Sequence, residues 1–278
     1  MAYKMSTRRK IAIATWGSPK EGNIYGKLTL DATKSLMYID YLKSNGHKKV
    51  TITHIVGKAI ALALASAPYL NGRIVFGKYV AHDSVDIAFL VTIENGNNLA
   101  QYKICNINKK SVVEISKELF RSAEILRKGT DKNLKKSKFI LKLLPTWIIR
   151  PLLSLIGYLT GILGIKINIL GIDSFPFGSC LITSVGMMGL SEVFVPPTPF
   201  THVPIYVVVT LIKKSPVVKD GNIVIRKEIN LMVTVDHRFI DGYQGAKLVK
   251  IIQRLFNNPW ELDGLKNAPW KLFNDKKC

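Results

Sequence analysis

Apolar and polar positions along the chain first follow the period of a strand and then that of helices. Residues 24–31 alternate between apolar and polar side chains, which predicts a strand with one buried face. Helices are predicted over 32–45, ending at Gly46, and over 51–66, ending before Pro68. The second helix is apolar on nearly every side, so we expect it to lie at the centre of the core.

Short apolar runs bounded by turn residues predict a sheet of several strands. Residues 73–80 indicate a hairpin through Gly77, and 84–93 indicate a strand that ends before the turn-forming residues 95–98. An amphipathic helix is predicted over 111–128. The C-terminal part predicts a strand from Cys180 into a glycine-bearing turn, strands at 205–212 and 229–237 with an Asp220-Gly221 hairpin between them, and a last helix at about 242–256.

The segment 132–170 departs from this alternation. Its first part is rich in lysine, and the part from Pro151 to Ile165 is uncharged. A membrane-spanning helix needs about 20 apolar residues, and this run is shorter and interrupted by glycines. Basic residues beside an apolar helix with a tryptophan suit contact with a membrane surface, here through 140–165, although a buried helix or a subunit contact would give the same pattern. We therefore expect one α/β domain over 1–278 with an apolar, basic-flanked insert at about 132–170.

Charge narrows the classes of partner. Lysine and arginine outnumber aspartate and glutamate by 40 to 19, which gives a formal net charge of +21. Such a charge suits nucleic acid, an anionic membrane or a phosphate-bearing ligand, and it also arises from solvated lysines in a lysine-rich proteome. Because no nucleic-acid-binding motif accompanies the charge, we do not expect nucleic acid as a partner.

The cysteines and the N-terminal residues of the sequence indicate the cellular compartment. Cys105, Cys180 and Cys278 are far apart and form no CxxC pair, so neither a zinc site nor a disulfide framework is expected. The N-terminal residues are basic, with only a very short apolar stretch, which is not the pattern of a secretory signal. We expect a cytoplasmic protein, peripheral to the membrane if the insert touches lipid.

The stretch DHRFIDG at 236–242 is the strongest candidate for chemistry. His237 follows a continuous strand and precedes a turn that contains Asp241 and Gly242, so its imidazole can face a cleft. An unperturbed histidine pKa of about 6.5 suits proton removal at neutral pH. A lone histidine is more often an ordinary core or surface residue, and only the surrounding pattern outweighs that interpretation.

The pattern HxxxDG within DHRFIDG resembles the active-site motif of dihydrolipoyl acyltransferases and chloramphenicol acetyltransferases. The form DHRxxDG is more specific to the catalytic domain of the dihydrolipoyl branch. The resemblance implies an α/β fold like that of chloramphenicol acetyltransferase, a two-layer sandwich in which helices cover a mixed β-sheet. Further stretches resemble that domain in the same order: STRRKIA at 6–12, HIVGKAIALALASAPYLNG at 54–72, HDSVDIAFLVT at 82–92, LITSVGMMG at 181–189 and VPPTP at 195–199.

The resemblance implies that His237 is the general base of an acyl transfer. It would take a proton from a nucleophile that attacks a thioester carbonyl. The position of the oxyanion donor falls on Thr183, three residues before Gly186, with Ser184 as the alternative. Because side chains alternate along a strand, only one of the two can face a cleft. Thr183 is also an ordinary β-forming residue that needs no such role.

The resemblance implies a structural role for Asp241 and Gly242 beside the histidine. In the family, the aspartate pairs with an arginine and holds the histidine loop, and the matching arginine falls on Arg8, with Arg9 as the alternative. A buried carboxylate needs such a partner, because an unpaired buried charge costs about 3–5 kcal/mol. Otherwise, Asp241 would cap the helix that follows it or serve the turn.

The resemblance also implies partners. The family forms homotrimers with active sites between subunits, so His237 and Thr183 need not be close within one chain. Coenzyme A or acyl-coenzyme A would be a substrate, with no covalently bound cofactor and no metal. The expected activity is acyl transfer between coenzyme A and a thiol, hydroxyl or amine acceptor.

Three departures from the family bear on that activity. No stretch resembles a lipoyl domain or a subunit-binding domain, so we do not expect this chain alone to serve as the core of an oxo-acid dehydrogenase complex. NGNNLAQYKI at 95–104 replaces the family stretch DGLVVPV, and the segment 132–170 is longer and more apolar than the loop it replaces. These departures favour a changed acceptor. They leave open a catalytically silent scaffold or membrane-associated adaptor on the same fold.

Overall fold

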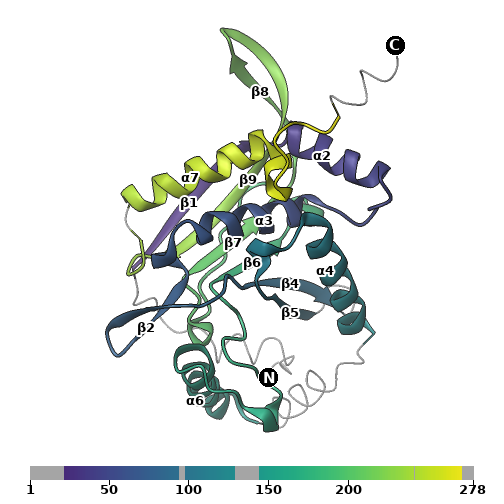
Figure 1. Ribbon diagram of the computed structural model, residues 1–278. Coiled ribbons are helices and arrows are strands. Elements are labelled where there is room, and N and C mark those ends of the chain that lie inside the picture. Colours follow the sequence, from purple (N-terminus) through teal and green to yellow (C-terminus); the bar gives the residue numbers. More distant parts are fainter. Residues whose placement is uncertain (1–21, 94–97, 129–143, 241, 271–278) are drawn as a thin grey trace, which may run out of the picture.

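A seven-stranded mixed sheet forms the centre of the protein. The computed structural model describes residues 22–93, 98–128, 144–240 and 242–270 (Figure 1). Strands follow one another in the order β1-β9-β7-β6-β4-β5, and β8 pairs with β9 beside this path. The pairs β4·β6 and β6·β7 are parallel, and the other pairs of this sheet are antiparallel.

The strands and helices follow the predicted order, apart from strand β5, which the sequence did not predict. The strands are β1 (Asn23–Asp31), β2 (Gly72–Val75), β3 (Lys78–Ala81), β4 (Ile87–Ile93), β5 (Asn98–Ile104), β6 (Cys180–Ser184), β7 (Ile205–Val209), β8 (Lys213–Lys219) and β9 (Asn222–Asp236). The α-helices are α2 (Thr33–Ser44), α3 (Ile52–Ala65), α4 (Val112–Arg127), α6 (Thr146–Gly157) and α7 (Gly242–Asn257). A π-helical turn, Tyr158–Ile162, extends α6, and short 3₁₀ turns occur at Pro68–Leu70, Ile107–Lys109, Asn168–Leu170, Gly186–Met188, Pro199–Thr201 and Pro259–Asp263.

Helix α3 lies at the centre of the core, as its sequence predicts. Ten of its 14 residues are buried. Thr51 caps its start: the Thr51 backbone N–H donates to Nδ1 of His54 at 2.9 Å. Lys58 is buried in the same helix, and its ammonium donates to the carbonyl groups of Asn108 and Lys110 at 2.7 and 2.5 Å. Burial lowers the pKa of Lys58, and these two carbonyls solvate the charge that remains inside the protein.

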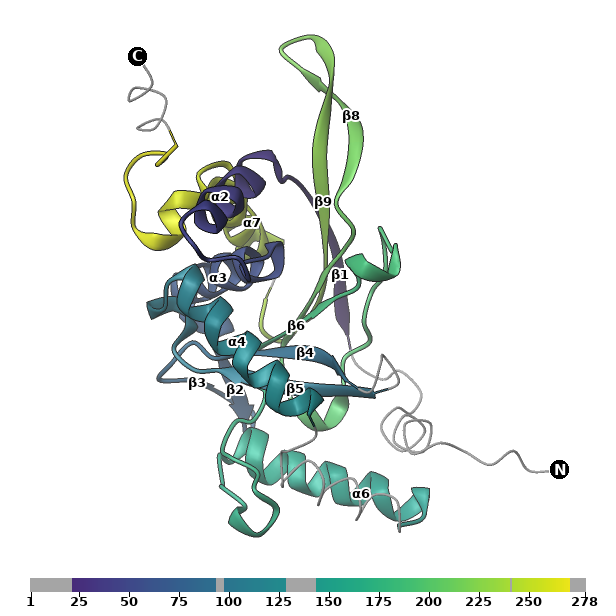
Figure 2. The same cartoon turned by 90° about the vertical axis from the view of Figure 1, so that its right-hand side faces the viewer.

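The sheet and helices form the predicted two layers. Figure 2 shows α2, α3, α4 and α7 on one side of the sheet, where the main core includes Cys180 and Ile182 of β6. On the other face, Leu181 and Tyr206 pack with residues of the segments before and after β6. The expectation of an α/β sandwich with a mixed sheet is therefore confirmed.

The described part of the insert stands apart from the helix layer. Figure 2 shows α6 beyond the lower end of the sheet, and the β8–β9 hairpin extends from the opposite end. Within the described ranges, every helix is too short or too polar to span a bilayer. The turn expected at 95–98 lies largely outside the described residues, as does the lysine-rich start of the insert.

Candidate functional site

His237 directly follows the last residue of β9 and continues the pairing of that strand with β1. Its backbone N–H donates to the carbonyl of Gly22 at 3.2 Å, one step beyond the pair Asn23 and Asp236. The His237 Cβ lies 4.0 Å from the position that a Cβ on Gly22 would occupy. The His237 side chain is exposed, and none of the described residues forms a hydrogen bond with its ring.

The turn that carries His237 is anchored on both sides. The Asp236 carboxylate accepts from the backbone N–H of Arg238 at 2.9 Å and from its guanidinium at 2.5–3.0 Å. Phe239 donates its N–H to the Asp236 carbonyl at 3.1 Å, and its side chain is buried with Ile240 in the main core. These contacts hold the backbone of the turn in place, and the His237 side chain remains exposed.

Thr183 and Ser184 lie at the far end of β6. Thr183 is partly buried on the face that Leu181 shares, and Ser184 is exposed at the strand end. A turn at Gly186–Met188 follows, and both of its methionines are exposed. Among the described residues, this strand end is therefore accessible to a partner.

Within one chain, His237 and Thr183 lie at opposite ends of the sheet. Extending the register of β9 with β7, and then of β7 with β6, places His237 level with Gly178, five residues before Thr183. With about 3.3 Å per residue and about 4.8 Å between neighbouring strands, the two backbones are roughly 20 Å apart. No single thioester carbon can contact both side chains of the same chain.

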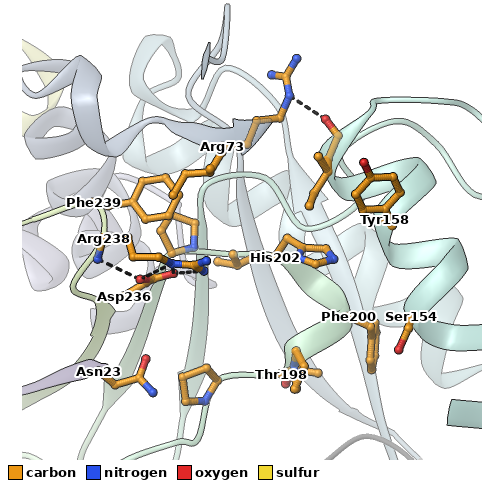
Figure 3. A pocket seen from close by; sticks show the side chains of 16 residues that line it. Asn23, Arg73, Ser154, Tyr158, Thr198, Phe200, His202, Asp236, Arg238 and Phe239 are labelled. Carbon is orange, nitrogen blue, oxygen red and sulfur yellow. Dashed lines mark hydrogen bonds and ion pairs between the residues drawn. The ribbon is translucent and has the colours of Figure 1, made fainter. Parts of the chain in front are cut away.

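A cavity of about 530 Å³ lies beside the histidine turn (Figure 3). Asp236, Arg238 and Phe239 form one side, and residues of α6 and its π-helical extension, including Ser154 and Tyr158, form another. The loop that leads to β7 contributes a third side: Pro197, Thr198, Pro199, Phe200, His202, Val203 and Pro204. Asn23, Arg73 and Ile74 complete the lining. The cavity therefore joins the turn of the candidate base to the insert.

His202 projects into this cavity and was not singled out by the sequence. Figure 3 shows its ring between the turn with Arg238 and the helix with Tyr158. Desolvation by the surrounding protein lowers the pKa of His202, and the positive charge of Arg238 lowers it further. Both effects favour the neutral form of the ring. Its signal in the sequence is faint, because it follows a proline-rich loop and matches no motif.

Arg73 connects the body of the protein to the insert. Its Nε donates to the Ile162 carbonyl at 2.8 Å, and its guanidinium lies 4.4 Å from the ring centre of Phe175. His82 lies 3.3 Å from the same guanidinium, and burial together with Arg73 lowers its pKa to about 4. Arg73 therefore links the wall of the cavity to the insert.

Several predicted residues lie outside the described part of the chain. These are Arg8, Arg9 and Asp241, so their predicted pairing stays a prediction. Gly242 begins α7, and no atom lies within 4 Å of the position of an added Cβ. In the described ranges, no group of three or more His, Cys, Asp or Glu side chains is placed to hold a metal ion.

The fold and the placement of these residues agree with the sequence resemblance. A two-layer α/β sandwich with a histidine at one strand end and a hydroxyl at another is the arrangement that this resemblance implies. The family model for the catalytic domain of 2-oxoacid dehydrogenase acyltransferases matches residues 6–140 and 165–263. The chain therefore belongs to this family. The interval between the two matched stretches contains α6 and its π-helical turn.

Similar proteins carry related names. The dihydrolipoyllysine-residue acetyltransferase component of the pyruvate dehydrogenase complex of Rickettsia felis is 23% identical over 214 residues, which is 76% of this chain and 41% of that protein. This chain thus spans less than half the length of that relative. The crystal structure of a probable dihydrolipoamide acetyltransferase from Listeria monocytogenes 4b F2365 has a TM-score of 0.67 and 20% identity, over 96% of this chain and 97% of that one.

A second solved structure has the same fold. Dihydrolipoamide acetyltransferase of Azotobacter vinelandii has a TM-score of 0.63 and 18% identity, covering 92% of this chain and 87% of that one. That structure comes from work on a serine, a histidine and an asparagine in the catalytic mechanism of the Azotobacter enzyme.

Proposed function

We propose that this protein transfers an acyl group between coenzyme A and an acceptor, with His237 as the general base. The observation that carries the proposal is the placement of His237. Its turn is anchored by Asp236 and Phe239, and no described residue forms a hydrogen bond with its ring. Membership of an acyltransferase family supports the same chemistry.

The reaction begins with proton transfer from the nucleophile to the imidazole of His237. Neutral His237 takes the proton from the nucleophile, a thiol, hydroxyl or amine, as its heteroatom bonds to the thioester carbon. The carbonyl oxygen becomes an oxyanion, to which the Thr183 hydroxyl of a neighbouring subunit donates a hydrogen bond. Collapse of this intermediate breaks the carbon–sulfur bond, and the imidazolium returns the proton to the coenzyme A thiolate.

A trimer reconciles this chemistry with the distance inside one chain. His237 and Thr183 are separated by roughly 20 Å, and both lie at accessible strand ends. A cyclic arrangement lets the histidine end of one subunit meet the hydroxyl end of the next. In the Azotobacter enzyme the asparagine follows the histidine by four positions, and Asp241 occupies that spacing here. We propose that Asp241, paired with Arg8, holds the histidine turn.

The acceptor is proposed to differ from that of the relatives. One wall of the cavity beside the histidine turn comes from Ser154, Tyr158 and Ile162, which lie between the stretches matched by the family model. An insert at this place reshapes the space beside the turn that carries the base. The net charge of +21 favours approach of the coenzyme A phosphates regardless of the acceptor.

The experiment is a transferase assay with acetyl-coenzyme A. Purified protein is incubated with dihydrolipoamide, a primary alcohol or a primary amine, and acetylated product and free coenzyme A are separated by chromatography. We expect turnover with at least one acceptor class, and His237→Ala to reduce kcat by about 10²–10⁴-fold. His47→Ala, remote from the turn, is the control. Absence of turnover with all three acceptors would favour the scaffold or adaptor.

We also propose that α6 contacts an anionic membrane surface, which makes the protein cytoplasmic but peripheral to the membrane. Only Ile149 and Gly157 of α6 are buried. Trp147 is 76% exposed and Leu155 is 56% exposed. Arg150 is exposed on the same helix, and five lysines lie between 132 and 142 in the sequence before it. An exposed tryptophan beside basic residues is the pattern of an interfacial helix.

A further inference from the structure

An apolar cavity of about 280 Å³ lies between the sheet and two helices. Its floor is formed by β1, β7 and β9, and its roof by α3 and α7. Aliphatic side chains line nearly all of it, together with Gly26, Gly242 and Gly245, and Lys27 is the single charged residue among the described residues that line it. Lys27 is paired with Glu192, so its charge is already engaged.

The cavity exists because α7 packs closely on the core only towards its end. Ile252, Leu255 and Phe256 are buried, whereas Leu248 in the first half of α7 is only partly buried. Gly242 and Gly245 add no side chain to this half. The apolar face of α7 is therefore left partly unfilled near the start of the helix, which directly follows the histidine turn.

His237 is the next residue on the face of β9 that lines this cavity. Val233 and Val235 line it from the helix-facing side of β9, and side chains alternate along a strand, so His237 is the next position on that face. The distance of 4.0 Å between the His237 Cβ and the Cβ position of Gly22 supports this, because Gly22 shares its face with the lining residue Ile24. Asp236 lies on the opposite face, towards the larger cavity.

We propose that this apolar cavity receives the aliphatic chain of an acyl-coenzyme A, so that the protein prefers medium-chain acyl groups to acetyl groups. The proposal rests on the proposed acyltransferase function. A volume of 280 Å³ equals about nine water-sized groups of about 30 Å³ each, which suits a chain of roughly eight carbons. Polar ligands are disfavoured, because the lining offers almost no hydrogen-bond partners to replace water.

The experiment compares binding of octanoyl-coenzyme A and acetyl-coenzyme A to the whole protein by calorimetry. Each buried methylene strengthens binding by about fourfold, so six additional carbons are expected to lower Kd at least about tenfold even if only some are buried. Equal dissociation constants would overturn the proposal. Because binding needs no acceptor, this result is separable from failure of the transferase assay.

Filling the cavity tests its location. No atom lies within 4 Å of a Cβ added at Gly26, so Gly26→Ala, Gly26→Val and Gly26→Leu extend into open space. We expect the Kd for acetyl-coenzyme A divided by the Kd for octanoyl-coenzyme A to fall towards one along this series. Tyr25→Leu, on the opposite face of β1, is the control and is expected to keep the ratio. Gly245→Leu fills the cavity from α7 if the β1 variants fail to fold, and an unchanged ratio in a folded filling variant would contradict the proposal.

Discussion

Gly157 of α6 lies directly against the carbonyl group of Phe200. A β-carbon at Gly157 would overlap the Phe200 carbonyl, and one at Gly161 would lie 3.2 Å from the Thr201 carbonyl oxygen. Two glycines four positions apart therefore let the insert pack onto the backbone of the loop before β7. That loop also lines the cavity beside the histidine turn, so the position of α6 determines the shape of the cavity.

Gly157→Val is expected to lower the free energy of unfolding by about 1–3 kcal/mol, because a buried site without free volume must shift to admit the side chain. Urea denaturation measures this change. Leu155→Val on the same helix is the control, since Leu155 is 56% exposed and an exposed substitution changes stability by about 0.5 kcal/mol or less. Equal effects of the two substitutions would show that α6 is not packed on the loop.

Stability is expected to depend on pH through His54. Burial lowers the pKa of His54 to about 4, whereas an unfolded histidine has a pKa of about 6.5. Between these values the unfolded chain binds the proton and the folded protein does not, so stability falls as the pH decreases from 6.5 to 4. The full effect is about 3 kcal/mol.

His54→Gln tests this dependence without removing the helix cap, because a glutamine oxygen can also accept from the Thr51 N–H. Chemical denaturation of both proteins is measured from pH 7 to pH 4.5. The wild type is expected to lose stability relative to the variant as the pH falls. His82 also has a lowered pKa but is present in both proteins, so it cancels in the difference. Parallel curves would mean that His54 takes up a proton in the folded state.

Much of this fold follows from local patterns. The buried helix α3 is expected because its sequence is apolar on nearly all sides. The hairpin at Asp220-Gly221 is expected because an Asp-Gly pair favours a tight turn, and in the structure both residues have positive φ, 50° and 77°. His237 was singled out because a motif surrounds it. Each of these signals depends on residues adjacent in sequence, so each feature can be predicted from the sequence alone.

The cavities could not be predicted in this way. The larger one joins Tyr158 of the insert to Arg238 of the histidine turn, 80 positions later, and no local pattern relates the two. The apolar cavity arises where the first half of α7 is only partly packed on the sheet, while Phe256 at its end is buried in the core. Strand β5 also gave no signal, because NLAQYKI lacks a clear alternation and forms a strand through pairing with β4.

The oxyanion donor is expected to be Thr183 rather than Ser184. The two side chains lie on opposite faces of β6, so a neighbouring subunit can present only one to the thioester. Thr183→Val removes the hydroxyl with little change in shape and is expected to lower kcat by about 10²–10³-fold. Ser184→Ala should change kcat by less than about threefold in the same transferase assay. The reverse order would move the role to Ser184.

Vesicle binding is expected to depend on α6. We expect the protein to co-sediment with vesicles of phosphatidylglycerol and phosphatidylcholine more than with phosphatidylcholine alone, and to be released by salt. Trp147→Ser should weaken this binding about tenfold, because Trp147 is 76% exposed and would be buried in the interface. Ile223→Ser is the matched control, since Ile223 is 78% exposed on the β8–β9 hairpin. Equal losses for both variants would argue against a specific role of α6.

Subunit mixing tests whether the active site lies between chains. His237→Ala and Thr183→Val are each expected to be nearly inactive alone. When the two variants are co-expressed with different tags and isolated as mixed oligomers, an interface formed by the intact His237 of one chain and the intact Thr183 of its neighbour is complete. Every mixed cyclic trimer has one such interface out of three, so about a third of the wild-type activity should return. If both residues served the same chain, no mixed oligomer would contain a complete site and the mixture would remain as inactive as its components. The separation of roughly 20 Å within one chain argues for recovery.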